Sequence, residues 1–578
     1  MPRLSVKIVQ RTPAEDVNRF SIEVHPVLQR IYAFRGIYSD DELDLALAHL
    51  LPVSSLKGVG QAAALLMDAL KGKKSILIVG DYDADGATST ALAMLALKSF
   101  GAPDVSYLVP NRFEYGYGLS PELAELAAAR EPGLIITVDN GISSLSGIDR
   151  ANALGIPVLV TDHHLPADKL PAAAAIVNPN QPGDEFGSKN LAGVGVIFYV
   201  MAALHNALSE TGWFEQQQLL APKISDWLDL VALGTVTDLV PLDRNNRILV
   251  SQGLRRIRAG RCRPGIRALL AVAKRPLSRV VASDMGFAVG PRLNAAGRLE
   301  DMGVGIECLL TESEAVAQEL AETLDELNQA RRSIELEMRE QAEDALEQLH
   351  RMTEGELPAG LCLYDKAWHQ GVVGILASRI KEQYHRPVIA FADGGDGQLK
   401  GSARSIKGLH MRDLLDRIAT RQPDMVKRFG GHAMAAGMTL NTDSFQAFKS
   451  AFEKEVEESV DSTMLQGLLL TDGELEPEDL TLEVAQTLRD AGPWGQAFPE
   501  PLFEGEFRLQ HQRVVGERHL KLRLSTGRGG EIVEGIAFNQ SMLPKSTQTV
   551  KLAYRLDVNE FRGVRQPQLI VEYIQSNP

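Results

Sequence analysis

Short runs of apolar residues alternate with longer amphipathic stretches through the first half of the chain. The apolar runs fall at 76–79, 105–109, 134–138 and 158–160, and stretches with helical spacing fall at 87–100, 121–129 and 145–154. Within each run the apolar residues are continuous, which is typical of strands that are covered on both faces. This alternation predicts a parallel α/β sheet.

The segments around this region follow other patterns. Residues 1–70 are polar with helical spacing, and Ser39 with the acidic residues after it marks a helix start. The pattern after Leu191 is mainly helical to about residue 270. Residues 311–352 contain no Pro or Gly and are rich in Glu, Gln and Arg, but their a/d repeat is poor. They predict a long connecting helix rather than a coiled coil.

A second α/β pattern occupies 360–437, and short β-type runs split by Gly, Asn and Pro follow from about residue 500. The last runs predict a small all-β barrel or sandwich. We therefore expect a multidomain α/β protein. Its parts would be an N-terminal helical extension 1–70, a catalytic α/β domain 71–310, the long helix 311–352, a second α/β domain 353–455, and 456–578, an acidic linker or helical segment with the all-β domain.

Length and cysteine content narrow the class. A chain of 578 residues can bury enough core to fold without disulfides. Cys262, Cys308 and Cys362 lie far apart and match neither a disulfide framework nor a zinc site, which favours a reducing compartment. No stretch has the roughly 18 uncharged apolar residues of a membrane helix. We expect a soluble, cytoplasmic protein that does not bind membranes.

Charge is distributed unevenly along the chain. The net charge of −15 argues against a polyanionic partner, because phosphate binding depends on Lys and Arg. Residues 505–578 nevertheless carry 11 Lys and Arg against 7 Asp and Glu, whereas 453–490 is heavily acidic. One basic module within an acidic protein is therefore compatible with nucleic-acid binding. The acidic stretch is assigned no role.

Acidic and imidazole side chains follow three of the predicted strands. Asp81 and Asp83 come after 76–79, Asp139 comes after 134–138, and Asp162, His163 and His164 come after 158–160. The carboxyl ends of parallel strands meet at one edge of a sheet, where ligands bind. Carboxylates that close cannot all stay ionised without cations. The sequence therefore predicts a metal site.

The donors are carboxylates and imidazole without thiolate, which suits Mn²⁺ or Mg²⁺ better than structural zinc. A bridging Asp between two ions ~3.5–4 Å apart would form the two-metal arrangement of phosphoester hydrolysis. Taken alone, an Asp-x-Asp near Gly is usually a solvated turn, and a His pair occurs by chance. Repetition at three strand ends favours the metal site. Asp85 is interpreted as a turn residue before a helix that starts near Thr88.

Several motifs carry a family resemblance. GDYDADG, TVDNG and TDHH, in this order and spacing, resemble the first three motifs of the DHH phosphoesterase family, and Asp238 in LGTVTD would be the fourth. GGHAMAAG at 430–437 resembles the glycine-rich motif of the DHH-associated domain, DHHA1. GPWG at 492–495 resembles the entry to the OB-fold domain of the family's exonucleases. The resemblance extends over nearly the whole chain.

The resemblance implies a single-stranded-DNA-specific 5′ to 3′ exonuclease of recombination and repair, releasing nucleoside 5′-monophosphates. It places two ions on five ligands, Asp81, Asp83, Asp139, His163 and Asp238. Asp139 would be the bridge, and His164 would face the scissile phosphate, so Asp139 and His164 are the predicted catalytic residues. Asp162 would orient a metal-bound imidazole. Leu77 stands where some relatives have a metal-binding His.

Several loops offer contacts for DNA. Arg112 and Tyr115 in 111–118 would contact a phosphate and stack on a base, unless the segment is an ordinary glycine-rich loop. Arg292 and Arg298 would bind phosphate oxygens or else pair with nearby Glu.

The second α/β domain has small residues beside charged ones, which suits an anion site. By resemblance to DHHA1 domains, three residues form a predicted pocket for the 5′-phosphate: Ser402, Arg404 and His432. The polarity of the reaction follows from the resemblance alone.

We expect single-stranded DNA to thread through a cleft between the two α/β domains of a monomer. The resemblance adds a single-strand-binding protein and a helicase as partners. One alternative is a DHH-family phosphodiesterase for short oligonucleotides or dinucleotides. Another is a non-enzymatic replication scaffold, which the nearly complete ligand set disfavours.

Overall fold

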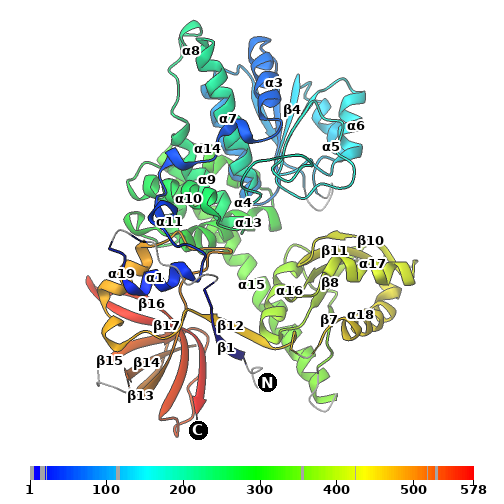
Figure 1. Cartoon of the computed structure of the whole chain (residues 1–578). Coiled ribbons are helices and arrows are strands. Elements are labelled where there is room, and N and C mark those ends of the chain that lie inside the picture. The colour runs from blue at the N-terminus through cyan, green and yellow to red at the C-terminus, as the bar shows by residue number, and fades with distance from the viewer. Residues whose placement is uncertain are drawn as a thin grey trace. The chain divides into compact units, whose positions relative to one another are not determined.

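The computed structural model of the chain describes residues 6–13, 20, 23–111, 117–352, 357–423, 425–461, 463–516, 518–526 and 532–577 (Figure 1). The chain forms two compact units, each made from segments distant in sequence. The first unit comprises Met1–Val9 and Gln329–Leu470, and the second comprises Gln10–Asn328 and Thr471–Pro578.

A five-stranded parallel sheet forms part of the second unit. Its strand order is β3 (Val105–Leu108), β2 (Ile76–Val79), β4 (Leu134–Val138), β5 (Val158–Thr161) and β6 (Ala175–Val177). Every residue of β2, β4 and β5 is buried, which confirms the predicted sheet with two covered faces. The short β6 is a strand that the sequence pattern did not predict.

Helices cover both faces of this sheet. Leu77 and Val79 point to the face covered by α5 (Pro121–Ala128) and α6 (Leu145–Ala153). The alternate residues Ile76 and Ile78 join the core with α3 (Val59–Lys71), α4 (Ala84–Ser99) and α7 (Gly193–Glu210).

In the described part of the chain, α7 has the length and hydropathy of a membrane span, and 61% of that span is buried inside the fold. Residues 47–71, which contain the 3₁₀ turns η1 (Leu47–His49) and η2 (Val53–Ser55) and helix α3, meet the same criteria only as a bent pair.

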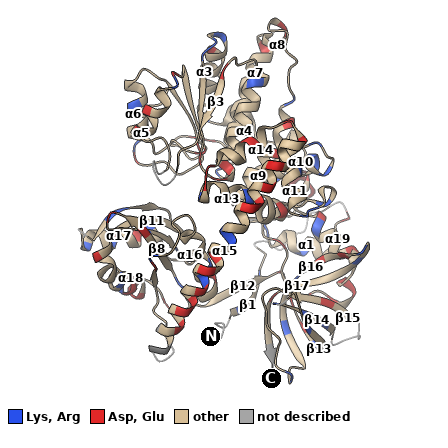
Figure 2. Ribbon diagram, turned by 180° about the vertical axis from the view of Figure 1, so that it is seen from behind, with Lys and Arg blue, Asp and Glu red and all other residues tan. Residues whose placement is uncertain are grey.

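A helical layer follows the sheet in the chain. It contains α8 (Trp213–Gln216), η3 (Ile224–Trp227), α9 (Leu228–Thr237), α10 (Arg244–Arg258), α11 (Pro264–Val272), η4 (Leu277–Arg279), α12 (Ala282–Asp284), the π-helical turn η5 (Met285–Val289), α13 (Gly290–Leu299) and α14 (Gly303–Leu310). The predicted long helix is confirmed as α15 (Glu314–Met352), whose 39 residues carry acidic and basic groups along its length (Figure 2).

The first unit contains a mixed sheet with the order β10 (Val426–Gly431), β11 (Ala435–Asn441), β9 (Gln398–Arg404), β8 (Val388–Gly395) and β7 (Leu361–Tyr364). Only β7 and β8 are parallel. Its helices are α16 (Val373–Tyr384), α17 (Met411–Arg421), η6 (Thr442–Ser444) and α18 (Phe445–Ser459). This confirms the second α/β domain.

The C-terminal strands close into a barrel, which decides between the predicted barrel and sandwich. Its order is β13 (Phe503–Val515), β14 (His519–Thr526), β15 (Ile532–Ala537), β17 (Val564–Asn577) and β16 (Thr549–Phe561). This 1-2-3-5-4 order is that of an OB-fold.

Two expectations about flanking segments need correction. The N-terminal region contains a strand, β1 (Val6–Gln10), before its helices α1 (Pro26–Ala33) and α2 (Asp40–Leu43), and β1 pairs with β12 (Gly467–Thr471). The acidic stretch 453–490 is folded: it contains the end of α18, β12, the turn η7 (Pro477–Asp479) and α19 (Leu482–Asp490).

A buried ion pair connects α1 to the entry of the barrel. Arg35 Nη1 lies 2.8 Å from Asp472 Oδ1, and both side chains are almost fully buried. The Arg35 guanidinium also lies over the ring of Trp494, in the GPWG segment, with 5.2 Å between the guanidinium carbon and the ring centroid. Removing one partner of a buried ion pair leaves the other charge buried and unpaired, which is strongly destabilising. This contact therefore favours one position of the barrel within its unit.

Candidate metal centre

The turn after β2 places the first two carboxylates. Asp83 is the N-cap of α4, and its Oδ1 accepts the backbone N–H of Gly86 at 2.9 Å. A Cβ on Gly86 would lie 2.5 Å from the backbone oxygen of Asp81, so only glycine permits a turn this tight. The helix therefore begins at Ala84, four residues earlier than expected. Asn294 of α13 accepts the N–H of Ala84 at 2.8 Å.

Asp139 follows β4 with a left-handed backbone, φ 61°, and is only 2% exposed. A Cβ on Gly193, the first residue of α7, would lie 2.7 Å from the Asp139 Cβ. The next residue, Asn140, donates from Nδ2 to the carbonyl of Val79 at 3.1 Å and to that of Val138 at 2.9 Å. Asn140 thus connects the carboxyl ends of β2 and β4.

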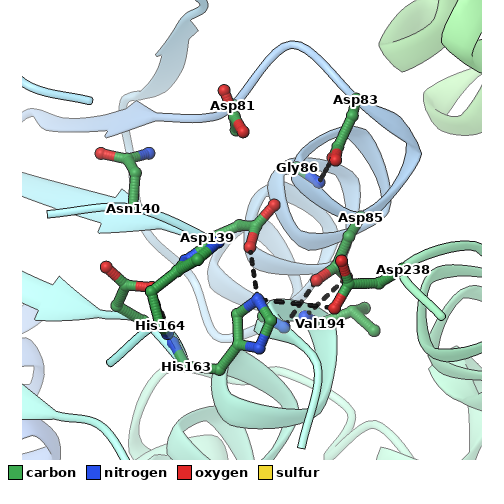
Figure 3. Close-up of polar contacts among 12 residues, drawn as sticks. Asp81, Asp83, Asp85, Gly86, Asp139, Asn140, His163, His164, Val194 and Asp238 are labelled. Atoms are coloured by element: carbon green, nitrogen blue, oxygen red, sulfur yellow. Dashed lines mark hydrogen bonds and ion pairs between the residues drawn. The ribbon is translucent and has the colours of Figure 1, made fainter. Parts of the chain in front are cut away.

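Three donor atoms from three elements converge (Figure 3). His163 Nε2 lies 3.1 Å from Asp139 Oδ1 and 3.5 Å from Asp238 Oδ2, where Asp238 ends α9. In the part of the chain that the structure describes, all three atoms are buried without a hydrogen-bond partner. Ligand atoms of Asp81, Asp83 and Asp139 form a second group within 4.8 Å of one another. Asp139 belongs to both groups.

The electrostatics of the cluster explain these orphaned atoms. Burial, and then the charges of Asp85 and Asp83, raise the pKa of Asp139 and of Asp238 well above the usual range. Burial, and then the charge of His164, lower the pKa of His163 to about 3, so its Nε2 is free to act as a ligand. Carboxylate and imidazole donors in two groups that share one carboxylate fit two divalent cations such as Mn²⁺ or Mg²⁺.

Asp162 holds His164 rather than His163. Its Oδ1 accepts the ring N–H of His164 at 2.8 Å and the backbone N–H of both histidines, and its Oδ2 accepts that of Ile142. The ligand atoms of His164 lie in one group with those of Asp139 and His163, so the expectation that Asp162 orients a metal-bound imidazole stays a prediction. Burial lowers the pKa of His164, but the hydrogen bond to Asp162 and nearby carboxylates outweigh it and raise this pKa to about 8.

Sequence reasoning missed the role of Asp85. Its carboxylate accepts the N–H groups of Gly193 at 2.6 Å and Val194 at 3.0 Å, which caps α7, and it lies in a group with His163 and Asp238. Burial, and then the charge of Asp83, raise its pKa to about 7. The two donors lie 108 and 109 residues after Asp85, so the sequence offered no signal for this contact beyond the third Asp of the motif.

Tyr117, near the end of the loop 111–118, contacts residues of the metal centre. Its hydroxyl donates to the carbonyl of Asp139 at 3.0 Å and lies 3.0 Å from Nδ1 of His164. Burial of the hydroxyl, and then the surrounding carboxylates, raise the pKa of Tyr117 well above its usual range. The neighbouring Arg112 and Tyr115 lie outside the described residues.

Helix α13 carries the next two predicted DNA contacts. Arg292 is 8% exposed, and its Nη2 lies 2.7 Å from Asp325 Oδ1, so the structure shows the ion-pair alternative, with an Asp in place of the expected Glu. Arg298 is half-buried in the last turn. It follows Gly297, where a Cβ would lie 1.8 Å from the backbone oxygen of Tyr82, so this turn adjoins the metal loop.

The predicted anion-binding residues lie in the first unit. Ser402 and Arg404 share one face of β9, and a Cβ on Gly374 in the first turn of α16 would lie 3.0 Å from Arg404 Nη2 and 3.5 Å from Ser402 Oγ. Arg404 donates to Ser378 Oγ and to the carbonyl of Ala403.

Burial lowers the pKa of Arg404, and the partners that the described residues supply for it are a hydroxyl and a carbonyl rather than a carboxylate. His432 donates its backbone N–H to Ala435, which lies opposite Arg404 in the neighbouring strand. His432 therefore lies at the same end of the sheet as Arg404.

A parallel sheet with acidic and imidazole ligands at its strand ends, an added α/β domain and an OB barrel together define a metal-dependent phosphoesterase of the DHH class. Three family profiles agree: "DHH family, N-terminal domain" matches residues 75–235, "DHHA1 domain" matches 358–458, and "RecJ OB domain" matches 471–573. The chain belongs to the RecJ family of this class.

Individual relatives support this assignment. The chain is 55% identical to the single-stranded-DNA-specific exonuclease RecJ of Escherichia coli K12, over 98% of each chain. It is 51% identical to the single-stranded-DNA-specific exonuclease RecJ of Haemophilus influenzae, over 96% of this chain and 97% of the relative. The crystal structure of RecJ with Mn²⁺ from Thermus thermophilus matches with a TM-score of 0.78 and 31% identity, covering 100% of this chain and 80% of that one.

The stability of the protein should depend on pH differently with and without metal. Without metal, the raised pKa of Asp85, about 7, means that the folded state holds a proton that the unfolded state, with an ordinary pKa of about 4, has lost. This contribution to stability falls as pH rises between these values. Cation binding needs deprotonated carboxylates, so it strengthens over the same range.

The Tm difference between protein with Mn²⁺ and protein with chelator should therefore widen from about pH 5 to about pH 8. Differential scanning calorimetry measures it, with matched monovalent salt as the control. A constant or narrowing difference would contradict the assignment of these carboxylates to a metal site.

Replacing Asn140 should weaken metal binding, because its two hydrogen bonds set the spacing between the strand ends that carry Asp81 and Asp139. We expect Asn140→Ala to lower Mn²⁺ affinity about 10-fold, as loss of groups behind metal ligands commonly does. Calorimetric titration measures the affinity, and electron paramagnetic resonance reports coupling between two Mn²⁺ ions. The control is Asn152→Ala, an exposed Asn that also donates to a backbone carbonyl. Wild-type affinity and coupling in Asn140→Ala would refute this role.

Proposed function

We propose that the chain is a single-stranded-DNA-specific exonuclease that uses two divalent cations, Mn²⁺ or Mg²⁺, and acts in DNA recombination and repair. The observation that carries the proposal is the convergence of three buried donor atoms without partners, on Asp139, His163 and Asp238 of the described chain, beside the Asp81 and Asp83 pair. These five residues would hold the ions, with Asp139 as the shared ligand. The relatives that match the chain over nearly its whole length are single-stranded-DNA-specific exonucleases, which supports the same function.

Bound cations would supply an activated water for in-line attack and neutralise charge on the phosphoryl oxygens. The protein's own groups fix the geometry. Asp139 is held between β4 and the start of α7, and Asn140 fixes the distance between strand ends. Despite burial, the hydrogen bond to Asp162 and the nearby carboxylates raise the pKa of His164 to about 8, which favours its charged form, and Asp162 holds its ring. His164 would therefore stabilise negative charge on the scissile phosphate.

Polarity depends on the anion site in the second α/β domain. A guanidinium without a carboxylate partner among the described residues, a hydroxyl and the first turn of α16 suit a terminal phosphate. We assign this site, formed by Ser402, Arg404 and His432, to the 5′-phosphate. Hydrolysis from that end releases nucleoside 5′-monophosphates. Phosphate contacts ignore sequence, and an access route too narrow for a duplex would select single strands.

Other parts of the chain would make further contacts with DNA. Arg112, Tyr115 and Arg298 remain proposed contacts, whereas Arg292 would have to exchange Asp325 for a phosphate. The OB barrel suits single-stranded DNA. We retain 71–310 as the catalytic domain and 353–455 as the substrate-end domain.

We also propose a compartment, an oligomeric state and partner proteins for the enzyme. The described cysteines, Cys262, Cys308 and Cys362, are free, in keeping with a reducing cytoplasm. A monomer assisted by a single-strand-binding protein and a helicase is the proposed form. In the alternative, a phosphodiesterase for dinucleotides, the substrate would be too short to need the barrel.

Replacing the shared ligand tests the mechanism. Asp139→Ala should abolish release of nucleotides from an end-labelled single strand of about 40 nucleotides while binding of that strand persists, because backbone charge and stacking hold the DNA. Electrophoresis in Mn²⁺ or Mg²⁺ resolves the products by length, and fluorescence anisotropy reports binding. The wild type should also degrade this strand faster than a dinucleotide. Unchanged cleavage by the variant would contradict the assignment, and equal rates on both lengths would favour the dinucleotide alternative.

Replacing Arg404 tests the polarity site. We expect Arg404→Ala to lower kcat/KM about 10- to 100-fold on a 5′-phosphorylated strand, because a charged hydrogen-bond partner of the phosphate is lost. The same strand with a 5′-hydroxyl should be affected little. Arg428→Ala, an exposed arginine of β10 in the same sheet, is the matched control. Equal losses on both strands would argue against a 5′-phosphate pocket.

A further inference from the structure

The residue after the metal ligand Asp238 has an unusual backbone. Helix α9 ends at Thr237 with Asp238 as its C-cap, and Leu239 then adopts a left-handed conformation with φ 61°. Glycine is the usual residue at this position, because a side chain there is strained. The Leu239 side chain is nevertheless 65% exposed, so core packing does not explain it. A strained, exposed leucine beside a reactive centre indicates a function.

A second exposed apolar side chain lies on the neighbouring element. Phe287 is 76% exposed and belongs to the π-helical turn η5, a type of turn that is frequent at functional sites. Glycines on this turn and after it contact the end of α9. A Cβ on Gly286 would lie 3.4 Å from Val236 Cγ1, and one on Gly290 would lie 2.4 Å from Thr237 Cγ2. Phe287 and Leu239 therefore extend from two segments that are in contact.

Both side chains border one cavity of about 1040 Å³ within the second unit. Its lining includes six arginines and six acidic residues, and several of them pair. Arg275 lies 3.2 Å from Asp284, and Arg489 lies 3.9 Å from Asp557. Because the lining carries no excess of positive charge, Leu239 and Phe287 offer apolar contact rather than attraction for phosphates.

We propose that Leu239 and Phe287 form an apolar platform on which nucleobases of the single-stranded substrate pack next to the scissile phosphate. The proposal rests on the nuclease function inferred above, because a phosphodiester at the metal centre brings its flanking nucleotides beside Asp238. Every base has an apolar face, so such packing tolerates any sequence. In a duplex the base faces are already stacked on one another, so the platform adds a preference for single strands that does not depend on the width of an entrance.

Two variants remove the platform without disturbing the fold. Leu239→Gly suits the left-handed backbone better than the native residue, so its stability should not fall. Phe287→Ala removes an exposed ring. The matched control is Leu220→Gly, because Leu220 is 94% exposed and lies outside the cavity lining.

The probes are fluorescein-labelled oligothymidylate of about 20 nucleotides and a strand of equal length with abasic sites, both in chelator so that no cleavage occurs. The wild type should bind the oligothymidylate more tightly. Each platform variant should weaken that binding about 5- to 20-fold and leave the abasic strand nearly unaffected. The slope of log affinity against log salt concentration should stay unchanged, because no phosphate contact is lost. Leu220→Gly should match the wild type.

Two results would overturn the platform. Wild-type affinity of both variants for both probes would show that the surface does not contact DNA, as expected if it docks a protein instead. Equal weakening on both probes, with a shallower salt slope, would indicate phosphate contacts. A separate assay keeps the nuclease function distinguishable: if the wild type with Mn²⁺ fails to shorten an end-labelled single strand, the function and the platform fail together.

Discussion

The mutual repulsion of buried carboxylates dominates this structure. The five carboxylates come from the loop after β2, the first turn of α4, the loop after β4 and the end of α9, yet they lie close together: Asp81, Asp83, Asp85, Asp139 and Asp238. The imidazole that lies among them, on His163, does not neutralise them, because its pKa of about 3 leaves it uncharged. The fold therefore holds together carboxylates that must either take up protons, in line with their raised pKa values, or bind multivalent cations. Gly86, Gly193 and Asn140 are best understood as the residues that keep this unfavourable arrangement in place.

The two adjacent histidines of this centre differ in their hydrogen bonds. Among the described residues His163 Nε2 has no hydrogen-bond partner and is left as a ligand, whereas His164 donates to Asp162 and gains a pKa near 8. Adjacent residues of one chemical type thus differ in charge state, and the proposed roles of metal donor for His163 and phosphate contact for His164 follow this difference. The sequence motif shows the pair, but only the ring contacts show which residue does which.

Much of the fold could be predicted because buried parallel strands have a distinctive apolar pattern. The strands before Asp81, Asp139 and Asp162 were placed correctly, and the convergence of their ends follows from parallel geometry. What could not be predicted depends on distant partners. Asp85 accepts hydrogen bonds from Gly193 and Val194, and Arg292 pairs with Asp325, and no local pattern reveals either contact. The three-residue strand β6 is too short to give a periodic signal.

The division of the chain into units has a consequence for biosynthesis. Every residue assigned to the metal centre is translated by position 238, but the compact unit that contains these residues also includes Thr471–Pro578. The buried contact between Arg35 and Asp472 joins these early and late parts. Ribosomes make the chain from its N-terminus, and domains generally fold as units. The Arg35 guanidinium therefore gains its buried carboxylate partner only late in translation, and the surface of the early segment that the barrel covers stays open to solvent until the barrel emerges.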